Sequence, residues 1–268
     1  MGEKKQKRRR HQHLLEKYPW CTYCGGKSRA STVDHVPPRA VFDAKRRPQG
    51  LEFPACDPCN RGARLDELVA AFLSRIFPNP PNAERLEEVR KYGYEAQNNF
   101  PGLLEEMFSL SATQAADASR LLQQFDEPSG GVLNAQGPIL SDVMYSFAAK
   151  MAFALHFQLT GKVLPPEGAV MALWQTNVNF MQGQYPQEFI EKLGAPRTLR
   201  QGKWHVGEQF LYKSIGSENG ELTGHFATFR RSFGIIAFGD EDSERVTPPA
   251  YSDHLRIFNP GWLIARDQ

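Results

Sequence analysis

The sequence lacks the long apolar run that a membrane-spanning helix requires. Its most apolar stretch, "VMYSFAAKMAFALHFQL", contains Lys150 and His156 and falls short of the roughly 20 apolar residues that cross a bilayer. The basic N-terminus continues into "LLEKYPWC" and not into the apolar segment of a signal peptide. These absences predict a cytoplasmic protein that does not act on a membrane.

A strong net charge is also absent, because the 268 residues sum to only +2. The charge is unevenly distributed, however: "MGEKKQKRRR" holds six Lys and Arg against one Glu. Such a run is typical of a solvated tail or, alternatively, of an arm that contacts nucleic-acid phosphates. We predict that residues 1–18 form a basic flexible tail.

Cysteine is scarce, and all four cysteines lie in two Cys-x-x-Cys pairs. In a reducing compartment such pairs predict a zinc site and not disulfides, which would also strain each short turn. Four thiolate ligands leave no open coordination position, so this Zn²⁺ is expected to be structural. The predicted ligands are Cys21, Cys24, Cys56 and Cys59.

The middle of the chain has apolar residues at helical spacing. "DELVAAFLSRIF" predicts a helix stopped by Pro78, and "ILSDVMYSFAAKMAFALHFQLTG" predicts a core helix ended by Gly161. Two further helices are predicted in "NAERLEEVRKYGYEAQNNF" and "SATQAADASRLLQQFDE", with Asn82 and Ser111 as candidate N-caps. His156, within the core helix, is expected to be a packing residue.

From about residue 203 the apolar period changes to two, which predicts strands in "KWHVGEQFLYKS", "GELTGHFATFRR" and "SFGIIAFGD". Their interleaved aromatics and cations fit a nucleic-acid-binding sheet or an amphipathic sheet with one packed face, and we favour packing. The scattered His205, His225 and His254 are expected to be surface or packing residues. The predicted fold class is α+β, with a zinc-stabilised module at 19–77, a helical region at 78–200 and a β-rich antiparallel region at 201–268.

Three polar residues lie beside the cysteines. "TVDHVPP" favours a strand, on which the adjacent Asp34 and His35 face opposite sides unless the strand ends or bulges there. The two prolines make an ending plausible. Asn60 directly follows Cys59, so the zinc would fix it against this strand. We therefore predict that a carboxylate, an imidazole and a carboxamide converge.

These residues resemble the HNH endonucleases of the ββα-metal superfamily, in a bacterial branch with four zinc-binding cysteines. The matching pieces are the first Cys-x-x-Cys pair, "VDHVPP" and "PACDPCN", which span roughly residues 19–70. The resemblance implies a metal-dependent endonuclease that hydrolyses DNA phosphodiester bonds. It implies that Asp34 and Asn60 hold one catalytic Mg²⁺ or Mn²⁺ and that His35 is the general base. It says nothing about residues 80–268.

The sequence departs from the family at one place, where Leu51 stands for the central Asn that holds the loop, with Glu52 next to it. A backbone carbonyl is then expected to orient His35. Phosphate contacts are predicted for three arginines, although each could simply be solvated: Arg39, Arg61 and Arg64. The acidic pair Asp66 and Glu67 could partner these arginines or only favour a helix N-terminus.

Two other functions stay open. A catalytically weak or inactive zinc-stabilised module that binds DNA or RNA is the main alternative, and a zinc ribbon with a purely structural role is the other. The nuclease differs from the binding module in that Asp34, His35 and Asn60 jointly hold a metal ion. The structural zinc ribbon differs from both in that it does not bind nucleic acid. Residues 78–268 carry no recognised motif and could select the target, bind a protein partner or form a homodimer. Family analogy suggests a role in bacterial defence.

Overall fold

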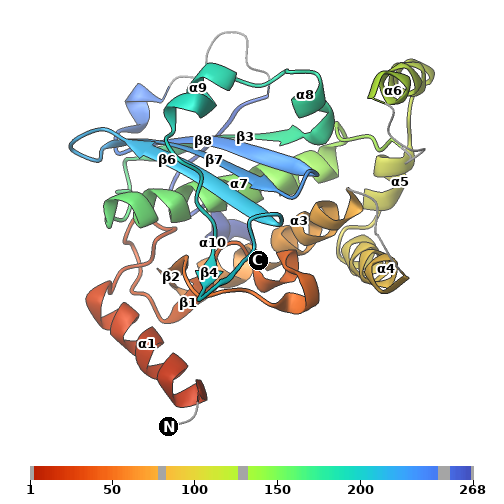
Figure 1. Cartoon of the computed structure of the whole chain (residues 1–268). Coiled ribbons are helices and arrows are strands. Elements are labelled where there is room, and N and C mark those ends of the chain that lie inside the picture. Colours follow the sequence, from red (N-terminus) through yellow and green to blue (C-terminus); the bar gives the residue numbers. More distant parts are fainter. Residues whose placement is uncertain (1–2, 78–82, 126–131, 247–253, 267–268) are drawn as a thin grey trace.

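The computed structural model describes residues 3–77, 83–125, 132–246 and 254–266. It combines helices with a small antiparallel sheet, which confirms the predicted α+β class (Figure 1). None of its described helices has the length and apolar character needed to span a bilayer.

The N-terminal module consists of a short hairpin followed by two helices. Strands β1 and β2 are antiparallel, and their register sets Asp34 opposite Phe53 and His35 opposite Glu52. Helix α3 ends at Ile76, ahead of Pro78, as predicted. The elements are β1 (Thr32–His35), the 3₁₀ turns η1 (Arg39–Val41) and η2 (Asp43–Lys45), β2 (Glu52–Ala55), α2 (Asp57–Gly62) and α3 (Arg64–Ile76).

The N-terminal segment is a helix, α1 (Glu3–Lys17), and the prediction of a flexible tail is therefore wrong. Its Lys, Arg, Gln and Leu residues are good helix formers, which the charge pattern obscured. Arg10 and His11 also reach Glu52 on β2, so tertiary contacts hold the helix against the hairpin. Figure 1 shows this helix in red beside β1 and β2.

The predicted helices are confirmed. Ser111 caps α6, because the Gln114 amide donates to its hydroxyl at 3.2 Å, whereas Asn82 lies outside the described residues. The core helix α7 is buried along most of its length and ends at Gly161, whose φ of +71° is the left-handed cap expected of glycine. The helices are α4 (Ala83–Asn99), α5 (Leu103–Phe108), α6 (Ala112–Phe125) and α7 (Pro138–Thr160).

The main sheet has the strand order β6-β7-β8-β3-β9, with every neighbouring pair antiparallel. Strand β3 lies inside the region predicted to be helical, so the boundary placed at residue 200 is wrong. Its apolar run "AVMALW" is too short for periodicity to separate a strand from a helix. The strands are β3 (Ala169–Thr176), β6 (Phe210–Gly216), β7 (Leu222–Phe229), β8 (Phe233–Asp240) and β9 (Arg256–Phe258), and β4 (Arg200–Gln201) and β5 (Trp204–His205) form a separate hairpin.

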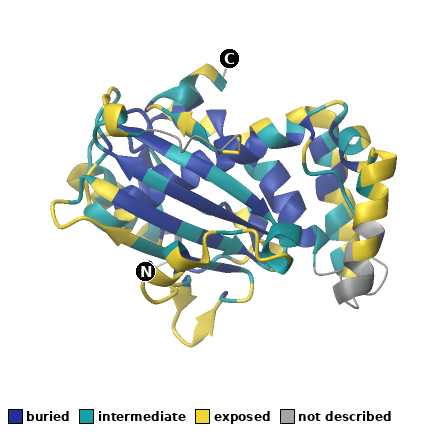
Figure 2. Ribbon diagram, turned by 90° about the horizontal axis from the view of Figure 1, so that it is seen from above, coloured by how far each residue is buried: buried dark blue, intermediate teal, exposed yellow. Residues whose placement is uncertain are grey.

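Helices cover both faces of this sheet (Figure 1). Phe147 of α7 packs on Phe229 and Phe233 on one face, and Phe180 and Phe189 from two short helices pack on the other. Figure 2 shows the central strands as mostly buried, which confirms the prediction that their aromatics pack. The remaining elements are α8 (Asn177–Met181), α9 (Gln187–Lys192), η3 (Ser243–Arg245) and α10 (Trp262–Arg266).

Helix α7 lies between the sheet and the N-terminal module, so two of its titratable residues, Lys150 and His156, contact different parts of the protein. Lys150 reaches the module, while His156 hydrogen-bonds Thr223 on β7. His156 and His225 are buried and His205 and His254 are exposed, which agrees with the packing or surface positions predicted for them.

Candidate functional site

The four cysteines converge as predicted. Their sulfur atoms all lie within 4.8 Å of one another and are buried, and none forms a disulfide. The Cys24 sulfur, together with burial, raises the pKa of Cys21 to about 12 against the opposing effect of Cys59, whereas the sulfurs of Cys21 and Cys59 lower the pKa of Cys24 to about 2. Like charges this close repel one another, so four thiolates would be stable here only with a cation among them. The cluster can hold a metal ion such as zinc, which accepts four thiolate ligands.

The cluster ties the first cysteine turn to the hairpin and to α2. Cys56 is the N-cap residue of α2 and Cys59 lies within that helix. The Thr22 amide in the first turn donates to the Pro54 carbonyl of β2 at 3.0 Å. A metal held here would therefore fix the start of α2 relative to the first turn, which is itself hydrogen-bonded to β2.

Asp34 points into the protein core. Its Oδ2 atom accepts a hydrogen bond from the Tyr23 hydroxyl at 2.8 Å and lies 2.7 Å from the Lys150 ammonium. Its Oδ1 atom accepts from the His35 amide at 2.8 Å. Asp34 is 5% exposed and Lys150 only 1%. The carboxylate expected to face a hydrated metal ion is thus neutralised by a buried lysine.

Lys150 has a second partner, Glu67 on α3, to which its ammonium donates. Burial acts to lower the pKa of Lys150, but the Asp34 and Glu67 carboxylates outweigh it and raise that pKa. Burial raises the pKa of Glu67 to about 7 despite the nearby ammonium. Asp66 binds Arg266 at 2.7 Å. The predicted acidic pair therefore forms ion pairs with residues far along the chain.

The predicted convergence of Asp34, His35 and Asn60 is only partly found. The Asn60 carboxamide donates to the Thr32 hydroxyl at 3.0 Å. Thr32 and Asp34 are two residues apart, so their side chains lie on the same side of β1. His35 points to the other side with its cross-strand partner Glu52. Strand β1 ends at His35, but Asp34 and His35 are both still paired with β2, so their side chains face opposite sides of the strand.

His35 meets a different set of groups on the outer side of the hairpin. Its Nε2 atom lies 3.7 Å from Glu52 Oε1, and its ring lies 5.8 Å from the ring of His11 on α1. His11 Nε2 is 3.9 Å from Glu52 Oε2. Arg10 donates to both Glu52 oxygens, at 2.7 and 3.1 Å. Among the described residues a carboxylate, and not the expected backbone carbonyl, is the polar neighbour of the His35 ring.

The electrostatics of this side keep both imidazoles neutral near pH 7. Burial, and then the charge of Arg47, lower the pKa of His35 to about 4, although Glu52 opposes them. Burial also lowers the pKa of His11. A neutral imidazole can accept a proton or bind a cation, so both side chains are in the form that either chemistry requires.

Of the three predicted phosphate-contacting arginines, Arg39 lies near His35 and near Lys7 on α1, and its charge adds to burial in lowering the pKa of both. Arg39 is exposed at η1. Arg61 lies on α2 and pairs with Asp57 at 2.9 Å. Arg64 is exposed at the first residue of α3.

Arg47 holds the loop between the two strands. Its guanidinium donates to four backbone carbonyls, at 2.8 to 3.1 Å, which belong to Val36, Pro37, Pro48 and Leu51. Leu51 is buried with φ of +48°, and its carbonyl also accepts from the Val36 amide. An arginine fork therefore holds this loop.

Sequence analysis missed several groups at this site: Lys7, Arg10, His11, Arg47, Glu52 and Lys150. Two signals were present. A histidine followed the arginines of the basic segment, and a single lysine interrupted an otherwise apolar helix. A lysine at such a position needs a buried carboxylate partner, which could have been sought among the acids of the module.

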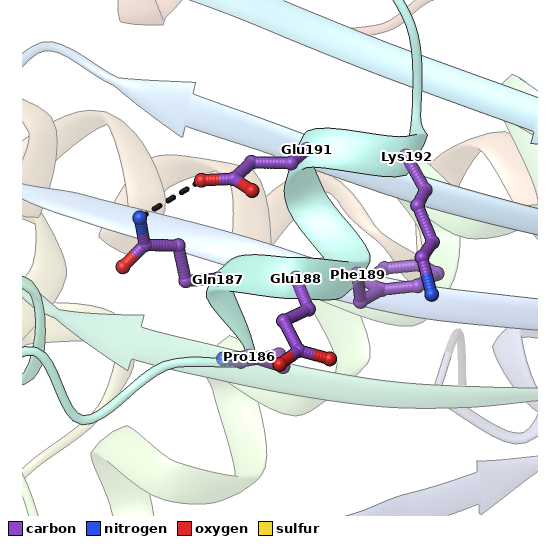
Figure 3. A pocket seen from close by; sticks show the side chains of 6 residues that line it. All are labelled: Pro186, Gln187, Glu188, Phe189, Glu191 and Lys192. Atoms are coloured by element: carbon purple, nitrogen blue, oxygen red, sulfur yellow. Dashed lines mark hydrogen bonds between the residues drawn. The ribbon is translucent and has the colours of Figure 1, made fainter.

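A separate hollow lies around α9 and is lined by Pro186, Gln187, Glu188, Phe189, Glu191 and Lys192 (Figure 3). Its side chains form one hydrogen bond, from Gln187 to Glu191 at 2.8 Å. The hollow is open, and none of its six lining residues is a histidine or cysteine. It gives no indication of a catalytic group.

Comparison with known protein families, curated proteins and solved structures finds no match for this chain. The arrangement around His35 and the cysteine cluster therefore carries the functional argument by itself.

Proposed function

We propose that this protein is a metal-dependent endonuclease of the HNH type that hydrolyses DNA phosphodiester bonds at His35. The observation that carries the proposal is a hairpin and helix joined by four cysteines, with His35 directed away from the core. The basic helix α1 lies across the same side, and Arg39 lies nearby. A histidine held in a cationic setting suits chemistry on a phosphodiester.

The chain supplies two functions that hydrolysis needs. Lys7 and Arg39 place positive charge near His35, where a backbone phosphate would be attracted. His35, which is neutral near pH 7, accepts a proton from the attacking water. The water oxygen bonds to phosphorus, the bond from phosphorus to the 3′ oxygen breaks, and that oxygen takes a proton from solvent. The products are a 5′ phosphate and a 3′ hydroxyl.

The pKa of His35, at about 4, makes it a weak base in the free protein. The negative charge of a bound phosphate favours the imidazolium form and raises this pKa toward the working range. Substrate binding would therefore improve His35 as a proton acceptor.

The resemblance to HNH enzymes assigns the divalent cation to Asp34 and Asn60. When bound, such a cation would polarise a phosphate oxygen. Asp34 already pairs with Lys150, so an ion at that carboxylate would have to compete with a buried ammonium. This contact favours a second candidate function, a zinc-stabilised module that binds nucleic acid and cleaves it weakly or not at all.

Cleavage of supercoiled plasmid by the purified protein tests the proposal. Reactions contain Mg²⁺, Mn²⁺, Zn²⁺ or EDTA, and the His35→Ala variant is compared with His13→Ala. His13 is exposed on α1, the helix that lies beside His35, and is a matched control for the loss of an imidazole. We expect metal-dependent nicking that His13→Ala retains and His35→Ala loses by at least about a hundredfold, the usual scale of general-base catalysis.

Retention of DNA binding without cleavage in any metal would favour the binding module. Equal cleavage by His35→Ala and the wild-type protein would place the reaction elsewhere.

A further inference from the structure

Three metal-binding side chains from three separate elements meet on the outer side of the hairpin. His11 comes from α1, His35 from β1 and Glu52 from β2, and one ligand atom of each lies within 4.8 Å of the others. The two imidazoles approach the two different oxygens of Glu52, at 3.9 and 3.7 Å. The carboxylate therefore lies between the rings.

We infer that His11, His35 and Glu52 form a binding site for a divalent transition-metal ion such as Zn²⁺, separate from the cysteine cluster. The inference rests on the proposed function in one respect, because it assigns this ion to the proposed nuclease as its catalytic metal. The metal would then lie on the side of β1 opposite to Asp34, and Asp34 and Asn60 would not be its ligands. Binding of the ion itself does not require that the protein cleave DNA.

The distances fit an ion with small adjustments. Nitrogen and oxygen ligands at about 2.0–2.2 Å from a tetrahedral ion lie roughly 3.3 Å apart. The observed separations of 3.7 and 3.9 Å exceed this by about half an ångström, which rotation of the side chains can supply.

Two further observations support a metal site. His11 Nε2 is a buried atom that has no hydrogen-bond partner among the described residues, and buried polar atoms seldom stay unpaired. Arg10 donates to both oxygens of Glu52 and holds this carboxylate in place. Carboxylates that ligate metals are commonly supported by a second hydrogen-bonded group in this way.

The donor set selects the kind of ion. Two imidazoles and one carboxylate form a common catalytic zinc ligand set, which leaves a position for water or a substrate oxygen. Magnesium prefers several oxygen ligands, and Glu52 is the one member of this set of three that supplies oxygen atoms. The nearby Lys7, Arg39 and Arg47 also disfavour a second positive charge unless an anion accompanies it. A phosphodiester supplies that anion. With the ion bound, His35 would be a ligand and would no longer accept the proton itself, and the ion would instead lower the pKa of the attacking water.

Cobalt titration of the full-length, zinc-loaded protein tests this inference, because Co²⁺ reports its ligands in the visible spectrum. We expect the wild-type protein to bind one further ion with the bands of nitrogen and oxygen ligation. The intense near-ultraviolet band of thiolate ligation should be absent, since the cysteines already hold zinc. His11→Ala and Glu52→Gln should each weaken binding at least about tenfold, and His13→Ala should leave it unchanged.

Unaltered cobalt affinity in His11→Ala and Glu52→Gln, or no second ion in the wild-type protein, would overturn the inference. Circular dichroism and zinc content of each variant show that the fold and the cysteine site persist. Plasmid cleavage by the same samples separates the two proposals. Cobalt binding without cleavage removes the nuclease and leaves the site, whereas Mg²⁺-dependent cleavage without a second transition-metal ion removes the site and leaves the nuclease.

Discussion

The Lys150 ammonium lies 2.7 Å from the Asp34 carboxylate, and both side chains are buried. This pair joins the middle of α7 to β1 and so couples the helical core to the hairpin beside the cysteine cluster. Together with the hydrogen bonds from Tyr23 and His35, the ammonium lowers the cost of burying this carboxylate.

Removing the ammonium should destabilise the protein strongly. Lys150→Met keeps the length of the side chain but leaves Asp34 and Glu67 buried together without a counter-charge. We expect the free energy of unfolding to fall by about 3–5 kcal/mol. Urea denaturation measures it. Lys203→Met, at an exposed position, should change it by less than about 0.5 kcal/mol, and equal values for the two variants would show that the pair is unimportant.

Replacement of Arg47 by lysine should loosen the loop between β1 and β2. An ammonium cannot span the four carbonyls that the guanidinium binds, so several carbonyls lose their donor. We expect Arg47→Lys to lower the free energy of unfolding by about 1–3 kcal/mol. The exposed neighbour Arg46→Lys is the control. If both variants unfold at the same urea concentration, Arg47 does not hold the loop.

Loss of one cysteine should remove the metal from the cysteine cluster and disorder the module around it. Cys59→Ser weakens a site that joins the first turn to α2, so the turn and the start of the helix lose their shared anchor. Zinc content should fall by one ion per chain, and the near-ultraviolet circular dichroism of the buried Tyr23 should weaken. EDTA treatment of the wild-type protein should have the same effect, reversed by added zinc. An unchanged spectrum in metal-free protein would contradict this role.

Stability should decrease in mild acid because of the buried histidines. Burial lowers the pKa of His156 to about 4 and that of His225 to about 3, whereas unfolded histidine titrates near 6.5. The unfolded chain therefore binds protons first as the pH falls below about 6.5, and the free energy of unfolding falls with it. For His156 the loss between about pH 7.5 and pH 5 is about 2 kcal/mol.

The variant His156→Gln, which retains a polar group for Thr223, should reduce this pH dependence. His205→Ala removes an exposed imidazole and should leave it unchanged. Urea unfolding at the two pH values measures both. An equal loss of stability in all three proteins would assign the acid sensitivity to other groups.

Local patterns predicted the helices well, because an amphipathic period of 3.6 and an end at proline or glycine act within one segment. The same reasoning placed α3 and α7, and period two located β6, β7 and β8. It failed for β3 and α1. The apolar run of β3 is too short to distinguish a strand from a helix. Helix α1 is held by contacts with Glu52, which lies far along the chain, so a local pattern does not reveal them.

The sequence by itself determined the cysteine cluster, since two Cys-x-x-Cys pairs at this spacing are typical of a metal site. It also determined that Asp34 and His35 would face opposite sides if the strand continued. Only the tertiary structure decided that both residues lie within the paired strand, that Lys150 lies on the side of Asp34, and that His11 and Glu52 lie on the side of His35. The physical reason is that charge partners are chosen by packing between distant segments, and residue spacing along the chain does not record that packing.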